Sequence, residues 1–465
     1  MAGTNLAEFV ERTATNFGIP GVAAGVLLDS MESYACHGVT STENPLPVDE
    51  DTLFLLASVS KTYTATALMR LVAEGHIELN APVRRYVREF KLKDERIADE
   101  VTVLNLLNHT SGMSWGLSVD TGEGDDALAG YVSKLPELDL IAPPGQRTSY
   151  SQAGYNLAGR IIEKVASLTF ERAVASLVFA PLGLSHSFYA RDDVMTRRFV
   201  VGHNRAADGR LSIARLWRPA RGNNPGGGIA ASVSDQLRWA RFHLGDGRSE
   251  SAERVLPAKV LHQMKEPTTA LRGSNMGDAV GISWFLRNVN GVGTIGHGGS
   301  ANGQFTELLI VPERQFAVVS LCNAGPDGIP CNQAIVRWAL QTYLGLIDRD
   351  PEPMPFDKPP AEEVVGSYED KVQNITIDIK DGSGLRIACR IKPEIRAAAK
   401  KELPPDHEPC DFGLLPGDKD EYIITSSALK GLRGFFSRDE NGAVVGVDIG
   451  GRQYSRVQSI ARPIT

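Results

Sequence analysis

Apolar residues recur at helical spacing in the stretch from residue 53 to residue 75, LFLLASVSKTYTATALMRLVAEG. The residues that share one side of the expected helix are Ala65, Leu68, Met69 and Val72. Gly75 follows them as a stop signal. The pattern therefore predicts a helix that begins at Ser58 and ends before Gly75.

Helical and strand patterns alternate over the first three quarters of the chain. The predicted helices are 4–17, 154–168, 234–245 and 332–344, and the predicted strands are 21–28, 32–37, 281–286, 294–297, 304–311 and 316–322. The turns between the later strands are too short for crossovers, which predicts an antiparallel sheet. The segment 190–225 has little periodicity and is predicted to be loop. The expected fold class is α+β, with an antiparallel sheet flanked by helices.

The pattern changes after a proline-rich stretch. The prolines are Pro351, Pro353, Pro355, Pro359 and Pro360, and such a run is typical of a linker. Beyond it, residues 375–379 alternate with period two, and Asn441-Gly442 is a strong hairpin signal. We therefore predict a first domain of helices and strands over 1–350, a linker over 351–360 and a small all-β barrel over 361–465.

Composition and charge narrow the classes of function. The chain has 465 residues, and its net charge of −7 gives no reason to expect nucleic acid or an anionic membrane as a partner. No apolar run is long enough to span a bilayer, and the first residues do not resemble a signal peptide. Five scattered cysteines without C-x-x-C fit buried thiols better than a disulfide framework or a zinc site. We expect a cytoplasmic location and no metal or cofactor.

The predicted helix start carries a serine and a lysine three residues apart. Residues at this spacing share a helix face, so the hydroxyl of Ser58 and the amine of Lys61 can touch as nucleophile and base. The plainer interpretation is an N-cap serine with a solvated lysine. Tyr150, after a Pro-Gly turn and before a helix, is a second candidate for proton transfer, although a packing role is the plainer interpretation.

A third candidate element is the sequence HGGS that begins at His297. Gly298 and Gly299 at a strand end allow a ligand to approach the backbone closely. The N–H of Ser300, paired with that of Ser58, would form an oxyanion hole. A glycine bulge beside a surface histidine is the alternative.

Together these elements resemble the penicillin-recognising serine enzymes, above all the class C β-lactamases with their esterase, D-aminopeptidase and transacylase relatives. The motifs that carry the resemblance are Ser58-x-x-Lys61, Tyr150-x-Gln152 and His297-x-Gly299. Surrounding phrases agree, among them LLNHTSGM from Leu106 and GGGI from Gly226. The resemblance implies a β-lactamase/transpeptidase-like fold with a helical subdomain, followed by a lipocalin-like barrel. It also implies an acyl-enzyme on Ser58, with Lys61 and Tyr150 sharing proton transfer.

Three positions depart from the family pattern. Gln152 stands where relatives have an asparagine that binds the lysine and the substrate amide, and glutamine adds a methylene. His297 replaces the lysine of the β-lactamase triplet, and Gly298 replaces its hydroxyl residue. A largely neutral imidazole without that hydroxyl holds a substrate carboxylate weakly. Efficient β-lactam hydrolysis is therefore disfavoured, while Gln152, His297, Gly298, Gly299 and Ser300 are expected to bind substrate or oxyanion.

The resulting hypothesis is a serine hydrolase or acyltransferase, which includes an esterase, an amidase, a D-stereospecific peptidase and a transacylase. Its substrate would be a small ester, amide or peptide, with water or an amine as acceptor. The alternative is a catalytically weak relative that binds a ligand as a sensor, which Gln152 alone favours. His109 and His203 lack ligand-like spacing and are expected to be structural. The oligomeric state stays open.

Overall fold

The computed structural model describes residues 5–457, apart from 118, 207, 399–402, 404–405, 407, 418–419 and 428. The chain forms two compact units. One contains residues 1–271 and 276–348, and the other contains residues 272–275 and 349–465.

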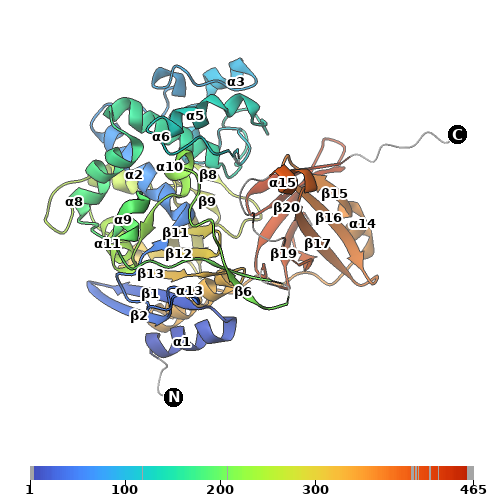
Figure 1. Ribbon diagram of the computed structural model, residues 1–465. Coiled ribbons are helices and arrows are strands. Elements are labelled where there is room, and N and C mark those ends of the chain that lie inside the picture. The colour runs from blue at the N-terminus through green and yellow to red at the C-terminus, as the bar shows by residue number, and fades with distance from the viewer. Residues whose placement is uncertain are drawn as a thin grey trace. The chain divides into compact units, whose positions relative to one another are not determined.

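An eight-stranded antiparallel sheet is the centre of the first unit (Figure 1). Its order is β2 (Met31–Gly38), β1 (Gly21–Leu28), β13 (Phe316–Cys322), β12 (Gln304–Val311), β11 (Val292–Ala301), β10 (Phe285–Val289), β9 (Ala279–Val280) and β8 (Thr269–Ala270). The first strand of the chain, β1, pairs with the last of this sheet, β13. The antiparallel arrangement confirms the prediction, whereas this pairing of distant segments was not visible in the sequence.

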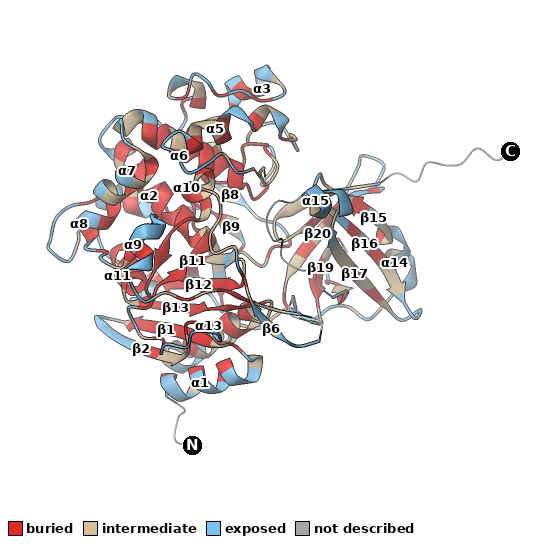
Figure 2. Ribbon diagram, viewed as in Figure 1, coloured by how far each residue is buried: buried red, intermediate tan, exposed pale blue. Residues whose placement is uncertain are grey.

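Helices cover both faces of the sheet. Alternate residues of β1 show this: Val22 belongs to the core formed with α1 (Leu6–Phe17) and α13 (Gly328–Leu344), whereas Ala23 belongs to the core on the opposite side. Buried residues consequently run along the whole of β1, β12 and β13 (Figure 2). Strands that are buried on both faces show continuous apolar sequences, which is why they were the most readable from sequence.

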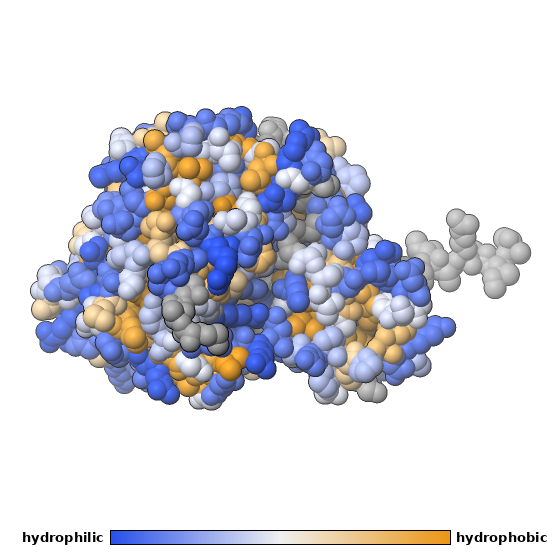
Figure 3. All heavy atoms as spheres, turned by 90° about the horizontal axis from the view of Figure 1, so that it is seen from below, coloured by the Kyte–Doolittle hydropathy of each residue, from blue (hydrophilic) through white to orange (hydrophobic). Residues whose placement is uncertain are grey.

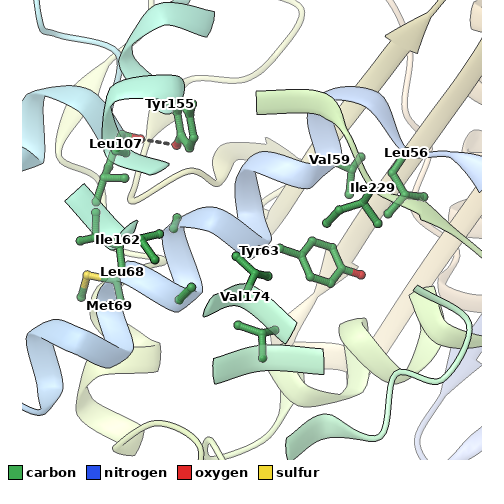
Figure 4. Packing of buried hydrophobic residues seen from close by; sticks show 14 of the residues in the cluster. Leu56, Val59, Tyr63, Leu68, Met69, Leu107, Tyr155, Ile162, Val174 and Ile229 are labelled. Atoms are coloured by element: carbon green, nitrogen blue, oxygen red, sulfur yellow. Dashed lines mark hydrogen bonds between the residues drawn. The ribbon is translucent and has the colours of Figure 1, made fainter. Parts of the chain in front are cut away.

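A helical layer lies on the side of the sheet away from α1. Its main helices are α2 (Ser60–Ala73), α4 (Val103–Leu107), α5 (Ala127–Ser133), α6 (Gln152–Ala166), α7 (Phe170–Val174) and α11 (Val233–Leu244). Shorter helices are α3 (Glu95–Glu100), α8 (Ala180–Leu182), α9 (Arg191–Met195), α10 (Asn224–Gly227) and α12 (Ala258–Gln263). Figure 4 shows Leu68 and Met69 of α2 beside Ile162 of α6 in the core of this layer. The other helices of this layer therefore pack around α2, the helix that follows Ser58.

Two predictions about local structure were wrong. The segment 190–225 is not all loop, because it contains α9, the start of α10 and the short strands β5 (His203–Arg205) and β6 (Leu211–Ile213). Of the predicted strand 281–286, only residues 285 and 286 are strand, as the start of β10, whereas residues 281–284 form a tight turn between β9 and β10, closed where Gly281 N–H donates to Trp284 O at 2.9 Å. Tertiary packing buries both apolar residues of this turn, so an apolar sequence resembled a strand.

The second unit contains a closed barrel of eight antiparallel strands, which confirms the predicted C-terminal barrel. The strands are β15 (Gly366–Glu369), β16 (Gln373–Lys380), β17 (Gly384–Ile391), β18 (Cys410–Leu414), β19 (Glu421–Ile424), β20 (Arg433–Arg438), β21 (Val444–Ile449) and β22 (Arg452–Arg456), with the helices α14 (Lys358–Val364) and α15 (Pro393–Ala398). Large aromatic side chains pack together in its core, among them Tyr368, Phe412, Tyr422 and Phe436. The described part of the barrel core is thus filled by side chains.

The surface seen in Figure 3 is mostly hydrophilic, with hydrophobic residues in small separate areas. Among the described residues, no single helix is long and apolar enough to cross a membrane. One helix pair, Gln152–Ala166 with Phe170–Leu182, bent by 76°, reaches the required length and composition when taken together.

Candidate active site

Ser58 lies in a single 3₁₀ turn, η1 (Ala57–Val59), directly before α2. The turn follows the short strand β3 (Phe54–Leu55). Ala57 has a φ of 47°, a left-handed conformation that costs a residue with a Cβ about 1–2 kcal/mol. Buried neighbours hold this conformation, among them Leu56, Val59 and Ile229, which lie together in Figure 4. The predicted helix start is present, although a strained 3₁₀ turn rather than the α-helix itself presents Ser58.

Lys61 is fully buried in the first turn of α2. Its Nζ donates to Ser58 Oγ at 3.2 Å, to Gln152 Oε1 at 2.7 Å and to the backbone oxygen of Gly226 at 2.6 Å. The same nitrogen lies 5.0 Å from the centre of the Tyr150 ring. The amine is therefore in hydrogen-bond reach of the serine hydroxyl and is held there by two further oxygen acceptors.

Gln152 occupies the first position of α6 and uses both ends of its amide. Its Oε1 accepts from Lys61, while its Nε2 donates to Asn156 Oδ1 and to Asn223 O, both at 3.3 Å. A Cβ on Gly226 would lie 1.9 Å from Gln152 Nε2. The glycine thus provides the space that the longer side chain needs, and Gln152 reaches the lysine as an asparagine would.

Tyr150 precedes Ser151, the N-cap of α6, and is almost completely buried. It packs with Val280 and Phe285, and partly buried Trp115, Leu271 and Met276 lie against this group. Its ring centre is 6.3 Å from that of His297. The structure therefore brings the predicted tyrosine together with Lys61 and with β11.

β11 passes close to the turn that carries Ser58. A Cβ on Gly299 would lie 2.1 Å from Leu56 O, so only glycine fits there without a shift of the backbone. Gly298 faces the carboxyl group of Glu307 on β12, whose Oε2 would be 3.0 Å from an added Cβ. Ser300 follows one residue beyond the close approach. These neighbours agree with an oxyanion site between Ser58 and Ser300, which stays a prediction.

His297 is a buried, neutral imidazole. Its Nδ1 is 2.6 Å from Gly298 O, which places the ring proton on Nδ1. Burial, and then the charge of Lys61, lower the pKa of His297 to about 3. The side chain therefore offers no positive charge to a substrate carboxylate at neutral pH, in line with the expectation from the sequence.

His109 is the site residue that sequence reasoning missed. Its ring centre lies 4.5 Å from that of Tyr150, and burial, followed by the charges of Lys61 and His297, keeps the pKa of His109 well below its usual value. By contrast, His203 lies in β5 and bonds Asn323 O through Nδ1 at 2.8 Å, which fits the structural role expected for it. The sequence feature that could have identified His109 as a site residue is its position in the family-like motif LLNHTSGM.

A metal site is not apparent in this geometry. Among the residues that the structure describes, no group of three or more His, Cys, Asp or Glu side chains is arranged to hold a metal ion. The described cysteines Cys36, Cys322, Cys331, Cys389 and Cys410 are free thiols.

The sheet, the helical layer and the serine–lysine pair define the β-lactamase/transpeptidase class of fold. The chain belongs to the Beta-lactamase family, whose profile matches residues 6–339. It is 32% identical over 321 residues to "Penicillin-binding protein 4" of Amycolatopsis lactamdurans, an alignment that covers 68% of this chain and 84% of the relative. The family is one of serine hydrolases.

Two solved structures show the same fold at low identity. SurE, solved with D-Leu, has a TM-score of 0.74 at 22% identity and covers 97% of this chain and 98% of its own. The D-amino acid amidase from Ochrobactrum anthropi SV3, complexed with L-phenylalanine, has a TM-score of 0.63 at 23% identity. It covers 73% of this chain and 98% of its own. The likeness to SurE therefore extends over the C-terminal barrel as well.

Proposed function

We propose that this protein is a serine hydrolase or acyltransferase that forms an acyl-enzyme on Ser58 from a small ester or amide. The observation that carries the proposal is the contact between the fully buried Lys61 Nζ and Ser58 Oγ at 3.2 Å. A nucleophile with a base in hydrogen-bond reach, and a base held by other groups, is the arrangement that covalent catalysis requires. Gln152 Oε1 and Gly226 O hold the lysine in this position.

The chemistry follows from these contacts. Ser58 Oγ attacks the substrate carbonyl, and its proton passes to the relay of Lys61 and Tyr150. The N–H groups of Ser58 and Ser300 stabilise the oxyanion. When the carbon–leaving-group bond breaks, the relay returns the proton to the departing alcohol or amine. Water, or an amine held in the site, then attacks the acyl-serine and releases an acid or a new amide.

The surroundings of Tyr150 suggest what the acyl group looks like. The partly buried side chains of Trp115, Leu271 and Met276 form an apolar rim beside it, which favours an apolar substituent near the reacting carbonyl. The neutral His297 and the absent hydroxyl at Gly298 disfavour a substrate that depends on a carboxylate contact. We therefore propose apolar amino acid esters, amides or short peptides as donors. The D-amino acid amidase neighbour makes D-configured donors the first to test.

The binding-only alternative loses the observation that favoured it, because Gln152 contacts Lys61 directly. A fluorophosphonate probe decides between the two. Wild type should be labelled at Ser58, as located by mass spectrometry, and Ser58→Ala should not be labelled. Ser60→Ala is the matched control, because this serine lies in the next turn and its Oγ accepts from Ile229 N instead. Unlabelled wild type, or labelling that survives in Ser58→Ala, would contradict the proposal.

The acceptor needs a second measurement. Wild type is given D- and L-phenylalanine methyl ester and amide, with and without an added primary amine. Hydrolysis alone would identify a hydrolase, and a new amide that depends on Ser58 would identify an acyltransferase. Trp115→Ala should raise the KM for the phenylalanine donors more than for p-nitrophenyl acetate, since only the former place a large apolar group at the rim.

A further inference from the structure

His109 lies beside Tyr150, the predicted catalytic tyrosine, and binds the backbone that carries it. Its backbone oxygen accepts from Ser149 N–H at 2.8 Å, and its ring Nδ1 accepts from Ser151 N–H at 3.1 Å. One residue therefore binds the backbone on both sides of Tyr150. In addition, the imidazole lies against the phenol ring, with 4.5 Å between the ring centres.

The backbone conformation of His109 is uncommon for a residue with a Cβ. It has a φ of 62°, in the left-handed region that side chains with a Cβ rarely adopt, at a cost of about 1 kcal/mol or more. The turn is anchored to α6, because Tyr155 OH donates to Leu107 O at 2.7 Å, a bond drawn in Figure 4. Thr110 N–H donates to Asn105 O at 3.0 Å on the other side. Strain that the surroundings maintain is typical of functional sites.

The hydrogen bonds also determine the tautomer. Because Nδ1 accepts from Ser151 N–H, the ring proton must lie on Nε2, and a doubly protonated imidazolium could not make this contact. Nε2 is buried and has no hydrogen-bond partner among the described residues. Lys61 and His297 face the ring and disfavour a positive charge on it. His109 is therefore kept as a neutral acceptor.

We propose that His109 is a positioning residue that orients Tyr150 toward Lys61, through the Nδ1 acceptor for Ser151 N–H and through contact with the phenol ring. The inference rests on the proposed function, in which Tyr150 takes part in proton transfer. His109 itself exchanges no proton with the substrate. Removal of its acceptor should misplace the tyrosine and slow acylation, while substrate binding stays largely intact.

Two substitutions separate the hydrogen bond from simple packing. Asparagine carries its Oδ1 on Cγ, as histidine carries Nδ1, and asparagine tolerates left-handed φ. Leucine fills much of the space but offers no acceptor. His109→Leu should lower kcat by about 10–100-fold with KM changed by less than about threefold, and His109→Asn should recover kcat to within about threefold of wild type.

The environment of Tyr150 can also be measured directly by ¹⁹F NMR, without any turnover of substrate. In protein that contains 3-fluorotyrosine, the ¹⁹F signal of residue 150 is assigned by its absence in Tyr150→Phe. His109→Leu should shift or broaden this signal, and His109→Asn should restore it. His203→Ala removes another buried, hydrogen-bonded histidine and should leave both the signal and kcat unchanged.

The outcomes are distinct. A leucine variant with wild-type kcat and an unmoved ¹⁹F signal would overturn the proposal, and so would an asparagine variant as impaired as the leucine one. If His109→Leu does not fold, His109→Gln takes its place, since its amide extends one carbon beyond the Nδ1 position. Wild type that neither labels nor turns over substrate would refute the proposed function, while the ¹⁹F comparison would still test whether His109 orients Tyr150.

Discussion

The candidate active site and the barrel core bury different kinds of residues. Around Ser58 the structure holds a fully buried lysine and two residues with a Cβ at positive φ, Ala57 and His109. The barrel core instead packs aromatic rings such as Tyr422 and Phe436, whose centres are 5.4 Å apart. The arrangement around Ser58 lowers stability in order to hold catalytic groups in place. The barrel core follows the alternating apolar pattern of its strands. Departures from local rules of this kind are expected at functional sites.

The lysine offers the largest test of this contrast. Lys61→Met keeps the length of the side chain and removes the amine. We expect kcat to fall about 10³-fold or more, because the base is lost. The free energy of unfolding should fall by about 1–3 kcal/mol, because Gln152 Oε1 and Gly226 O lose their buried donor. Lys134→Met is the control on an exposed surface. Activity above a tenth of wild type in Lys61→Met would argue against the proposed relay.

In the barrel core, by contrast, the expected effect is a loss of stability rather than the loss of a catalytic group. Phe436 is completely buried among Tyr368, Phe412 and Tyr422. Phe436→Ala should lower the free energy of unfolding by about 3–5 kcal/mol, from lost burial and the remaining cavity. Val445→Ala, at a side chain that is 42% exposed, should change it by less than about 0.5 kcal/mol. Denaturant unfolding of both variants measures the difference.

Two glycines of the same strand sharpen the comparison within the site. Gly299→Ala would place a Cβ 2.1 Å from Leu56 O, whereas Gly293 has no atom within 4 Å of an added Cβ. Because β11 must move away from Ser58, Gly299→Ala should lower kcat/KM by about 10²-fold. Gly293→Ala should remain within about twofold of wild type. Equal activity of the two variants would mean that the close approach of β11 is not needed for the reaction.

The smallest expected effect comes from a carboxyl group behind the site. Burial raises the pKa of Glu307 to about 7, against the lowering effect of Arg287. The unfolded chain releases this proton near pH 4.5, so between about pH 4.5 and 7 the folded state binds more protons and stability falls as pH rises. The partly exposed carboxyl should account for about 2 kcal/mol over this window.

Glu307→Gln removes the titration and should flatten that slope. Denaturant unfolding of wild type and variant at pH 5 and pH 8 tests it, and the variant should gain more stability at pH 8 than at pH 5. A gain that is the same at both pH values would show that Glu307 titrates at its ordinary pKa in the folded protein.

Much of the fold was predictable because the apolar patterns are strong. The helix α2, the strands β1, β12 and β13, and the barrel hairpin at Asn441-Gly442 lie where the patterns predicted them. The failures were of another kind. Residues 281–284 form an apolar turn before β10, and β11 continues through its glycines to Ala301 because the neighbouring strand pairs with them. Pairing with the next strand, β12, overrode the local glycine signals there.

The sequence by itself determined the family, the order of the motifs and the residue types around Ser58, because motif residues and apolar periodicity are local properties of the chain. Only the tertiary structure decided what these residues do to one another. It placed Gly226 where Gln152 needs space, and it joined His109 by hydrogen bonds to the residues on both sides of Tyr150. Such contacts join residues far apart in the chain, or depend on a backbone conformation that packing maintains, and no local pattern records them.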